Sequence, residues 1–183
     1  MNLSNYFYWN NLFLPEEIKT INSLINKYKD KKEEEHLKSS SATKTSTVYP
    51  IKLMYLKDVL KKALEALILN NQDNFGYDIF DWSDEMEVNF NIYEKGQEYQ
   101  WHKDTGLLKS ADVKLTALIN LSDKSFKGGE LNLLDSIEAT PVPELNGVGS
   151  MVIFNSFILH KVNPITKGTR KTLTIFIRGP SFK

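Results

Sequence analysis

The chain has 183 residues, a length typical of one domain, and it contains no cysteine, which excludes disulfide scaffolds, thiolate zinc sites and cysteine nucleophiles. Its 23 basic residues balance its 23 acidic ones, so the composition argues against a general electrostatic affinity for nucleic acid. No apolar run approaches the roughly 18 residues of a membrane span, and the N-terminus lacks the pattern of a signal peptide. We therefore expect residues 1–183 to form one domain of a cytoplasmic protein that binds neither membranes nor nucleic acid, with its oligomeric state left open.

The first part of the chain, residues 1–85, is predicted to be helical support interrupted by one polar segment. Pro15, followed by two glutamates, is typical of a helix N-terminus, and apolar residues recur at helical spacing as far as Tyr28. A second amphipathic helix is expected over residues 53–70. Residues 30–47 contain almost no apolar side chain, which is typical of a solvated loop, with a mobile lid as the functional alternative.

The second part, residues 86–183, changes to the period of two that indicates β-strands. The alternation is clearest in EVNFNIY, KLTALINL and KTLTIFIR, and shorter strands are expected at 97–102, 129–134, 150–154 and 160–163. Many short strands separated by glycine-containing turns predict a β-sandwich, a barrel or a jelly roll. The expected fold is therefore mainly β with N-terminal helices, an α+β arrangement in which two helices pack on one sheet.

The two faces of the strand EVNFNIY differ in polarity. One face carries Val88, Phe90 and Ile92, and the opposite face carries two asparagines and Tyr93. If the helices cover the apolar face, the polar face must point into the barrel. A functional site is expected there.

Two of the three histidines stand in a pattern that suits a metal ion. His102 and Asp104 form a His-x-Asp pair on a predicted strand, where residues two apart point to the same side. His160, on a distant strand, supplies a second imidazole, whereas His36 lies in the polar segment and is expected to be solvated. Two imidazoles and one carboxylate suit non-haem Fe(II) and leave coordination positions open for substrate and O₂.

The chain has 21 lysines but only two arginines, so each arginine is informative. Arg170 shares its strand parity with Thr172 and Thr174, on the face opposite the apolar stripe. A buried guanidinium needs an anionic partner, and its planar fork suits a carboxylate. Two partners fit this requirement: a dicarboxylate co-substrate that binds the metal at its other end, or an acidic residue of the chain itself.

Together these motifs resemble the Fe(II)/2-oxoglutarate-dependent dioxygenases of the prolyl 4-hydroxylase type. The similar stretches are NIYEKGQEYQWHKD, LTALINLSDKSFKGGELNLL and GSMVIFNSFILHKVNPITKGTRKTLTIF, within residues 86–178. The resemblance implies a double-stranded β-helix, or jelly roll, over residues 86–183, supported by the N-terminal helices. It also implies Fe(II), 2-oxoglutarate as co-substrate and O₂, with ascorbate as a candidate reductant.

The resemblance further assigns roles to single residues. The two histidines and the aspartate of the predicted metal site match the family's iron ligands and catalytic centre. Arg170 matches the residue that binds the distal carboxylate of 2-oxoglutarate, and Tyr93 and Thr174 match residues that line its pocket. Tyr99 and Trp101 are weaker candidates, with Tyr99 expected to reach the cavity and Trp101, the neighbour of His102, expected to turn away. The GGE motif at 128–130 matches a turn, in which the glycines are expected to be structural.

The activity implied is a hydroxylation, and the leading hypothesis is hydroxylation of prolyl residues in a peptide or protein. A free amino acid or small metabolite is the second candidate substrate, and a non-catalytic jelly-roll binding module is the alternative from another class. Arg178 lies further from Arg170 than the second arginine of the nucleic-acid dealkylating branch, which counts against a nucleobase substrate.

Overall fold

The computed structural model describes residues 5–29, 43–105, 112–134 and 137–181. Both helices lie in the first half of the chain, α1 (Pro15–Tyr28) and α2 (Lys57–Asn70). The strands, in chain order, are β1 (Tyr6–Trp9), β2 (Thr47–Lys52), β3 (Glu87–Tyr93), β4 (Tyr99–His102), β5 (Asp112–Asn120), β6 (Lys127–Gly128), β7 (Leu131–Leu134), β8 (Ala139–Pro141), β9 (Met151–Asn155), β10 (Leu159–Val162), β11 (Ile165–Lys167) and β12 (Arg170–Gly179).

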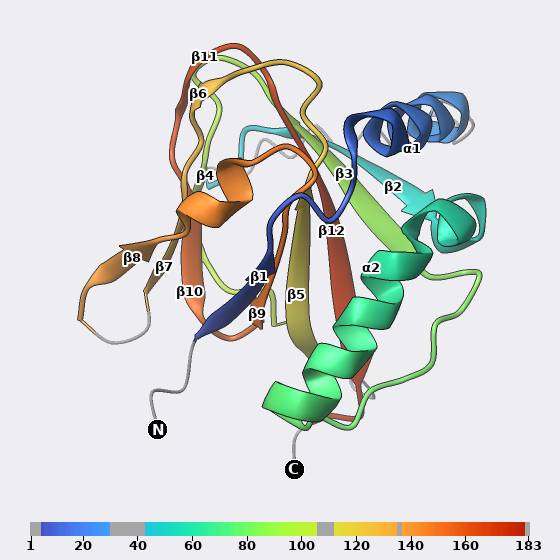
Figure 1. Cartoon of the computed structure of the whole chain (residues 1–183). Helices are drawn as coiled ribbons and strands as arrows, with labels where there is room; N and C mark the ends of the chain where they lie inside the picture. The colour runs from blue at the N-terminus through green and yellow to red at the C-terminus, as the bar shows by residue number, and fades with distance from the viewer. Residues whose placement is uncertain (1–4, 30–42, 106–111, 135–136, 182–183) are drawn as a thin grey trace.

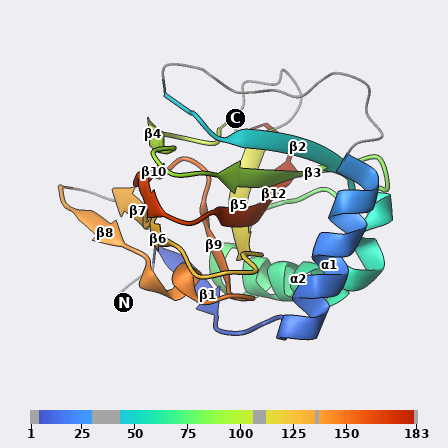
Figure 2. The ribbon, with the colours of Figure 1, turned by 90° about the horizontal axis from the view of Figure 1, so that it is seen from above.

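Two antiparallel sheets and a short ribbon organise the described residues. The larger sheet has six strands in the order β1–β9–β5–β12–β3–β2, and the smaller one has four in the order β4–β10–β7–β8. The ribbon joins β6 to β11 at one end of the molecule (Figure 1). The view from above shows the smaller sheet on one side of the larger sheet and both helices on the other (Figure 2). This arrangement confirms the expected jelly roll with two helices on one sheet.

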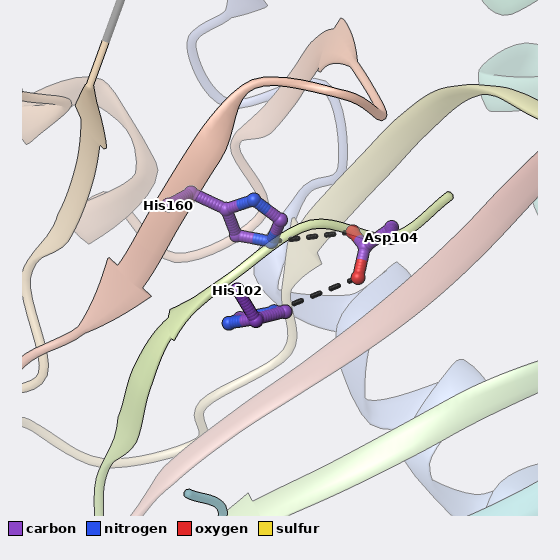
Figure 3. A group of neighbouring side chains, drawn as sticks. All are labelled: His102, Asp104 and His160. Carbon is purple, nitrogen blue, oxygen red and sulfur yellow. Dashed lines mark ion pairs between the residues drawn. The ribbon is translucent and has the colours of Figure 1, made fainter. Parts of the chain in front are cut away.

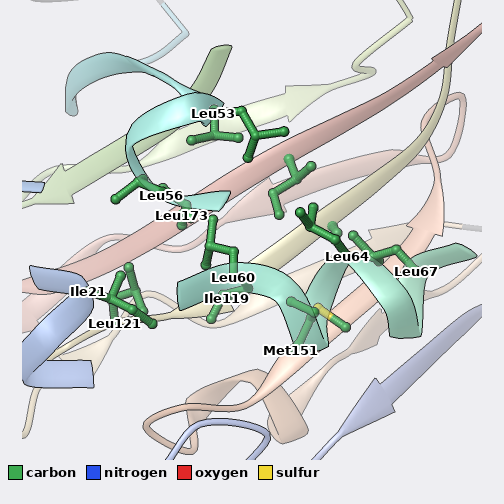
Figure 4. Close-up of a cluster of buried hydrophobic side chains, with 14 of the residues drawn as sticks. Ile21, Leu53, Leu56, Leu60, Leu64, Leu67, Ile119, Leu121, Met151 and Leu173 are labelled. Carbon is green, nitrogen blue, oxygen red and sulfur yellow. The ribbon is translucent and has the colours of Figure 1, made fainter. Parts of the chain in front are cut away.

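The helices cover the larger sheet with their apolar stripes. The first helix begins at Pro15 as predicted, and the backbone N–H of Leu14 donates to the carboxylate of Glu17 at 2.7 Å, which caps its first turn. The buried side chains of α2 pack against apolar residues of β5, β9 and β12, as Figure 4 shows for Leu60 and Leu173. The main hydrophobic core therefore lies between the outer face of the larger sheet and the two helices.

Two strands lie where the sequence predicted only helices and a loop. β1 and β2 extend the larger sheet at its two edges, so the prediction that residues 1–85 form only helices and a linker is wrong. Both are short, four and six residues, and a period of two is difficult to recognise over such a length. β2 also contains Pro50, which an edge strand tolerates because one side of its backbone needs no hydrogen-bond partner.

The polar segment predicted as a loop or lid over residues 30–47 is only partly described. Residues 30–42 lie outside the described residues, so neither interpretation is tested there. The end of the segment is not a solvated loop, because Ser46 is 1% exposed and Lys44 forms a β-bridge with Tyr99. The prediction of a solvated loop is therefore wrong for Lys44, Ser46 and Thr47, whereas Thr43 and Thr45 are exposed.

The strands predicted after residue 86 are confirmed, with small differences at their ends. The short strands β6, β8 and β11 were not predicted, because their turn-like or polar sequences carry no alternation. Between the sheets, the outer end is filled by an apolar cluster that includes Leu133 and Phe154. The rest of the interior contains the candidate site, whose wall combines polar and apolar side chains. No helix in the described part of the chain is long and apolar enough to cross a membrane.

Candidate metal centre and co-substrate cavity

The three residues predicted to bind a metal come together between the sheets. His102 ends β4, and His160 lies opposite it on the neighbouring strand β10. Asp104 follows just beyond the end of β4 rather than on the strand as predicted, and its backbone N–H donates to the carbonyl of Ser156 at 2.9 Å. This hydrogen bond fixes the backbone of Asp104, as pairing with a neighbouring strand would, and so positions its carboxylate.

The side chains of the three residues point toward one another (Figure 3). His102 Nε2 lies 3.5 Å from Asp104 Oδ1, and His160 Nε2 lies 3.2 Å from Asp104 Oδ2. Each residue offers one ligand atom, and these atoms lie within 4.8 Å of one another. The group can therefore bind one metal ion from one side.

Backbone carbonyls hold both imidazoles in the orientation that a metal ligand needs. His102 Nδ1 lies 2.7 Å from the carbonyl oxygen of Gln100, and His160 Nδ1 lies 2.9 Å from that of Ile158. Because a carbonyl only accepts, each Nδ1 carries the proton and each Nε2 presents a lone pair to the centre of the group. Such outer hydrogen bonds are typical of protein metal sites.

Asp104 is held as a carboxylate anion. Burial alone would raise the pKa of Asp104, but when the two imidazoles also carry a proton on Nε2, their hydrogen bonds and charges outweigh burial and keep the pKa well below its usual range. Thr116 Oγ1 also donates to Asp104 Oδ2 at 2.8 Å. The sequence did not single out Thr116, although its strand parity on β5 directs it inward.

Aromatic rings enclose the two histidines. The ring of Tyr99 stacks on that of His102 with centroids 3.3 Å apart, and Phe154 meets His160 edge-on at 4.8 Å. Trp101 does not line the cavity, and Lys161 Nζ lies 5.0 Å from the centre of its indole. The structure thus places Tyr99 toward the site and Trp101 away from it, as expected. Regular alternation would put both on one side, but an irregularity in the pairing of β4 with β10 between Tyr99 and His102 brings Tyr99 to the side of His102.

A cavity of about 210 Å³ opens beside the metal group. Its size suits a small molecule, because pockets for drug-sized ligands measure roughly 300–1,000 Å³. Asp104 is the one acidic residue among the described lining residues, which are Lys44, Asn89, Asn91, Tyr93, Tyr99, His102, Asp104, Leu118, Leu131, His160, Val162, Arg170, Thr172, Thr174 and Phe176. The cavity is therefore rich in hydrogen-bonding groups and carries more positive than negative side chains.

Arg170 lies at the start of β12 and is 2% exposed. Its guanidinium lies 5.4 Å from the centre of the Tyr93 ring, and within the described residues its Nη2 is buried without a hydrogen-bond partner. Burial lowers the pKa of Arg170, and the charges of Tyr93 and Glu130 oppose this shift. A buried donor on a cation without an acceptor is costly, so this position suits a ligand carboxylate.

The glycine pair predicted as a turn makes room for this arginine. Gly128 and Gly129 have φ values of +78° and +71°, which side-chain-bearing residues rarely adopt. A Cβ on Gly129 would lie 2.9 Å from Arg170 Cδ. The turn is therefore structural, as expected, and it shapes the wall behind the guanidinium.

Thr174 lies in the cavity as predicted, and two of its neighbours add to the site. Asn91 Nδ2 donates to Thr174 Oγ1 at 2.9 Å, and Lys44 Nζ donates to Asn91 Oδ1 at 3.1 Å. Burial lowers the pKa of Lys44 to about 8, and the charge of Asp104 opposes this shift. Asn91 belongs to the strand face predicted to point inward, whereas Lys44 was hidden in the polar segment predicted to be a loop.

Fold and site together define a class of protein. Two imidazoles and one carboxylate on one side of an ion suit non-haem Fe(II), and the cavity beside them offers a buried guanidinium to a carboxylate. The sequence model of the 2OG-Fe(II) oxygenase superfamily matches residues 88–178. The chain belongs to this superfamily, whose members use Fe(II), 2-oxoglutarate and O₂, and its residues fit these cofactors.

Curated relatives resemble the second half of the chain. The PKHD-type hydroxylase of Idiomarina loihiensis is 34% identical over 93 residues, which are 50% of this chain and 42% of that protein. The PKHD-type hydroxylase of Gloeothece citriformis is 35% identical over 85 residues, 44% of this chain and 37% of that protein. The chain thus spans less than half the length of these relatives.

Solved structures resemble the whole fold. A prolyl-4-hydroxylase from Pseudomonas putida superimposes with a TM-score of 0.75 at 18% identity, over 97% of this chain and 94% of that one. A Trichoplax adhaerens prolyl hydroxylase, in complex with a hypoxia inducible factor peptide fragment, has a TM-score of 0.72 at 15% identity, over 96% and 84% of the two chains. At these identities the likeness shows the fold alone.

Proposed function

We propose that the chain is an Fe(II)- and 2-oxoglutarate-dependent hydroxylase of prolyl residues in a peptide or protein, and that residues 1–183 form a single dioxygenase domain. The observation that supports this most directly is the meeting of His102, Asp104 and His160 beside the unpartnered guanidinium of Arg170. The hydroxylases among the relatives and the prolyl hydroxylases of similar fold support the reaction and the substrate class.

In this proposal the residues of the metal group hold Fe(II) through two Nε2 atoms and one carboxylate. When bound, the iron supplies the redox chemistry by which O₂ and 2-oxoglutarate oxidise a C–H bond. The chain contributes orientation: the carbonyls of Gln100 and Ile158 fix the imidazoles, and Thr116 fixes the carboxylate. The catalytic group thus needs no rearrangement before it accepts the ion.

Arg170 binds the distal carboxylate of 2-oxoglutarate in the proposed complex. The guanidinium is already buried, so binding a carboxylate compensates its charge and supplies the acceptor that Nη2 lacks within the described residues. Tyr93 and Thr174 line the same cavity and exclude water from the bound co-substrate. The protein therefore positions the co-substrate between a fixed cation and the metal group.

The proposal is tested by mass spectrometry on a panel of proline-containing peptides incubated with Fe(II), 2-oxoglutarate and O₂, with the Asp104→Ala variant as control. A gain of one oxygen atom on proline, absent with the variant, is the expected result. Oxygen added only to free amino acids would favour the small-metabolite alternative. Folded protein that consumes no 2-oxoglutarate with any substrate would instead indicate a binding module.

A further inference from the structure

The proposed roles leave one charged side chain of the cavity unused. Arg170 accounts for one carboxylate, and the metal group accounts for Asp104. Lys44 also lines the cavity, although it comes from a segment far from the metal-binding motifs in the sequence. Lys44 therefore adds a second cationic group, apart from Arg170, to the wall of the cavity.

The backbone around Lys44 is fastened to the strand that carries the metal group. Lys44 forms an antiparallel bridge with Tyr99 of β4. Gln100 N–H donates to the carbonyl of Thr43 at 2.8 Å, and Thr45 N–H donates to the carbonyl of Glu98 at 3.1 Å. Because β4 ends at His102, these bonds fix the lysine relative to the metal group.

The ammonium group of Lys44 is directed by two neighbours in the cavity wall. It donates to Asn91 Oδ1 and lies 4.8 Å from the centre of the Tyr99 ring. The amide of Asn91 is itself oriented, because its Nδ2 donates to Thr174 Oγ1 at 2.9 Å and to the carbonyl of Asn89 at 3.0 Å. The acceptor that holds Lys44 is therefore preorganised.

Lys44 and Arg170 enter the cavity at different positions along β3 and β12. Arg170 pairs with Tyr93 across β12 and β3, whereas the Asn91 that holds Lys44 lies one inward position further along β3. The charge of Asp104 also acts on Lys44, and the Tyr99 ring beneath it stacks on His102. Lys44 thus lies on the metal side of Arg170.

The charges of the described lining residues favour carboxylate ligands. Lys44 and Arg170 contribute two cationic groups to the wall, Asp104 contributes one carboxylate, and a bound Fe(II) would add positive charge. In a low-dielectric cavity such a set of charges attracts anionic groups.

We propose that Lys44 is a second carboxylate-binding residue of this site, on the metal side of Arg170. This role presupposes the proposed function. Two carboxylates can supply the chemistry: the one beside the keto group of 2-oxoglutarate, or the free carboxyl terminus of a peptide substrate. Burial keeps the pKa of Lys44 at about 8, so a bound carboxylate would also favour its ammonium form.

Calorimetric binding to the Mn(II)-loaded protein without O₂ separates the two sources. The first arm titrates 2-oxoglutarate, and the second titrates proline-containing peptides with a free carboxyl terminus, each beside its C-terminal amide, into protein saturated with 2-oxoglutarate. The variants are Lys44→Met, Lys44→Gln and Lys44→Arg, and Lys52→Met serves as control because Lys52 pairs with Glu85 on the surface. Circular dichroism melting verifies that each variant is folded.

We expect Lys44→Met and Lys44→Gln to lower the affinity for one of the two carboxylate ligands by about 10-fold or more, the effect of one charge-assisted hydrogen bond. Lys44→Arg should recover part of this affinity. Loss confined to 2-oxoglutarate assigns Lys44 to the co-substrate, and loss confined to acids that bind better than their amides assigns it to the substrate. Unchanged binding in both arms by folded variants overturns the role of Lys44 while leaving the proposed function intact. A wild-type protein that binds no 2-oxoglutarate overturns both.

Discussion

The two faces of the larger sheet perform different tasks with the same strands. On the outer face, Phe90, Leu115 and Leu173 are buried under the helices and stabilise the fold. On the inner face, Asn91 and Thr116 are just as buried but polar. Asn91 lines the cavity, and Thr116 donates to Asp104. The comparison shows that stability and chemistry are separated by strand parity, so each can be altered with little effect on the other.

Two polar pairs of the inner face are satisfied by hydrogen bonds, whereas in the described part of the chain Arg170 is not. Asn91 bonds Thr174, and Thr116 bonds Asp104, so the burial of these polar groups is compensated. Arg170 Nη2 has no partner within the described residues. A carboxylate ligand would therefore stabilise the folded protein as well as load the site.

The largest expected effect comes from removing a metal-binding residue of the inner face. His160→Ala deletes one of three protein ligand atoms, so Fe(II) affinity should fall by more than the ~10–100-fold typical of changes in outer hydrogen bonds, and turnover should be lost. Competition between Fe²⁺ and Ni²⁺, which lies above Fe²⁺ in the affinity order, measures the affinity. His36→Ala is the matched control, and wild-type affinity in His160→Ala would remove this residue from the site.

Truncating a core side chain under the outer face should instead lower stability and leave metal affinity unchanged. Leu60→Ala in α2 should lower the free energy of unfolding by about 2–5 kcal/mol, because Leu60 is fully buried against the sheet. Metal affinity of the folded fraction should stay near the wild-type value. Urea denaturation tests the stability, and Leu69→Ala, at a residue 57% exposed on the same helix, should cost less than about 0.5 kcal/mol. A loss of metal affinity in Leu60→Ala would contradict the separation of the faces.

Arg170→Ala should raise the 2-oxoglutarate requirement by about 10- to 150-fold, which corresponds to a charge-assisted hydrogen-bond pair of about 1.5–3 kcal/mol. Fe(II) binding should change little, because the metal group is untouched. Arg170→Lys should be milder, since it keeps the charge and one donor. A titration of 2-oxoglutarate against succinate release checks these effects.

The chain's other arginine supplies the control for this experiment. Arg178 lies near the opposite end of β12 and lines a separate hollow with Trp82 and Met86. Arg178→Ala should leave the 2-oxoglutarate requirement nearly unchanged. If Arg178→Ala raised the 2-oxoglutarate requirement and Arg170→Ala did not, the proposal would have assigned the carboxylate to the wrong arginine.

The smallest effect is expected from Thr116→Val, which removes the hydroxyl that orients Asp104 and preserves the shape of the side chain. Metal affinity should fall by about 10-fold, the lower end of the range for such outer hydrogen bonds. Mn(II) titration followed by calorimetry measures it, with Thr20→Val on the exposed side of α1 as control. Unchanged affinity would show that the backbone alone positions the carboxylate.

Parity explains how much of this molecule the sequence predicts. The alternation in β3 and β12 assigned Tyr93, Arg170 and Thr174 to the inner face, because a strand fixes the side to which each residue points. Lys44 could not be found in this way, since it lies outside any strand and reaches the cavity through long-range hydrogen bonds to β4. The edge strand β2 was not predicted for a related reason. Its pairing with β3 is a tertiary contact that its six residues do not encode alone.

The central claim is that the inner face brings Fe(II) and 2-oxoglutarate together. Anaerobic addition of 2-oxoglutarate to the Fe(II)-loaded protein, followed by visible absorption, tests it most directly. We predict a charge-transfer band in the wild type that saturates with 2-oxoglutarate and is absent from His160→Ala. Folded wild-type protein that binds Fe(II) and gives no band at saturating 2-oxoglutarate would contradict the account.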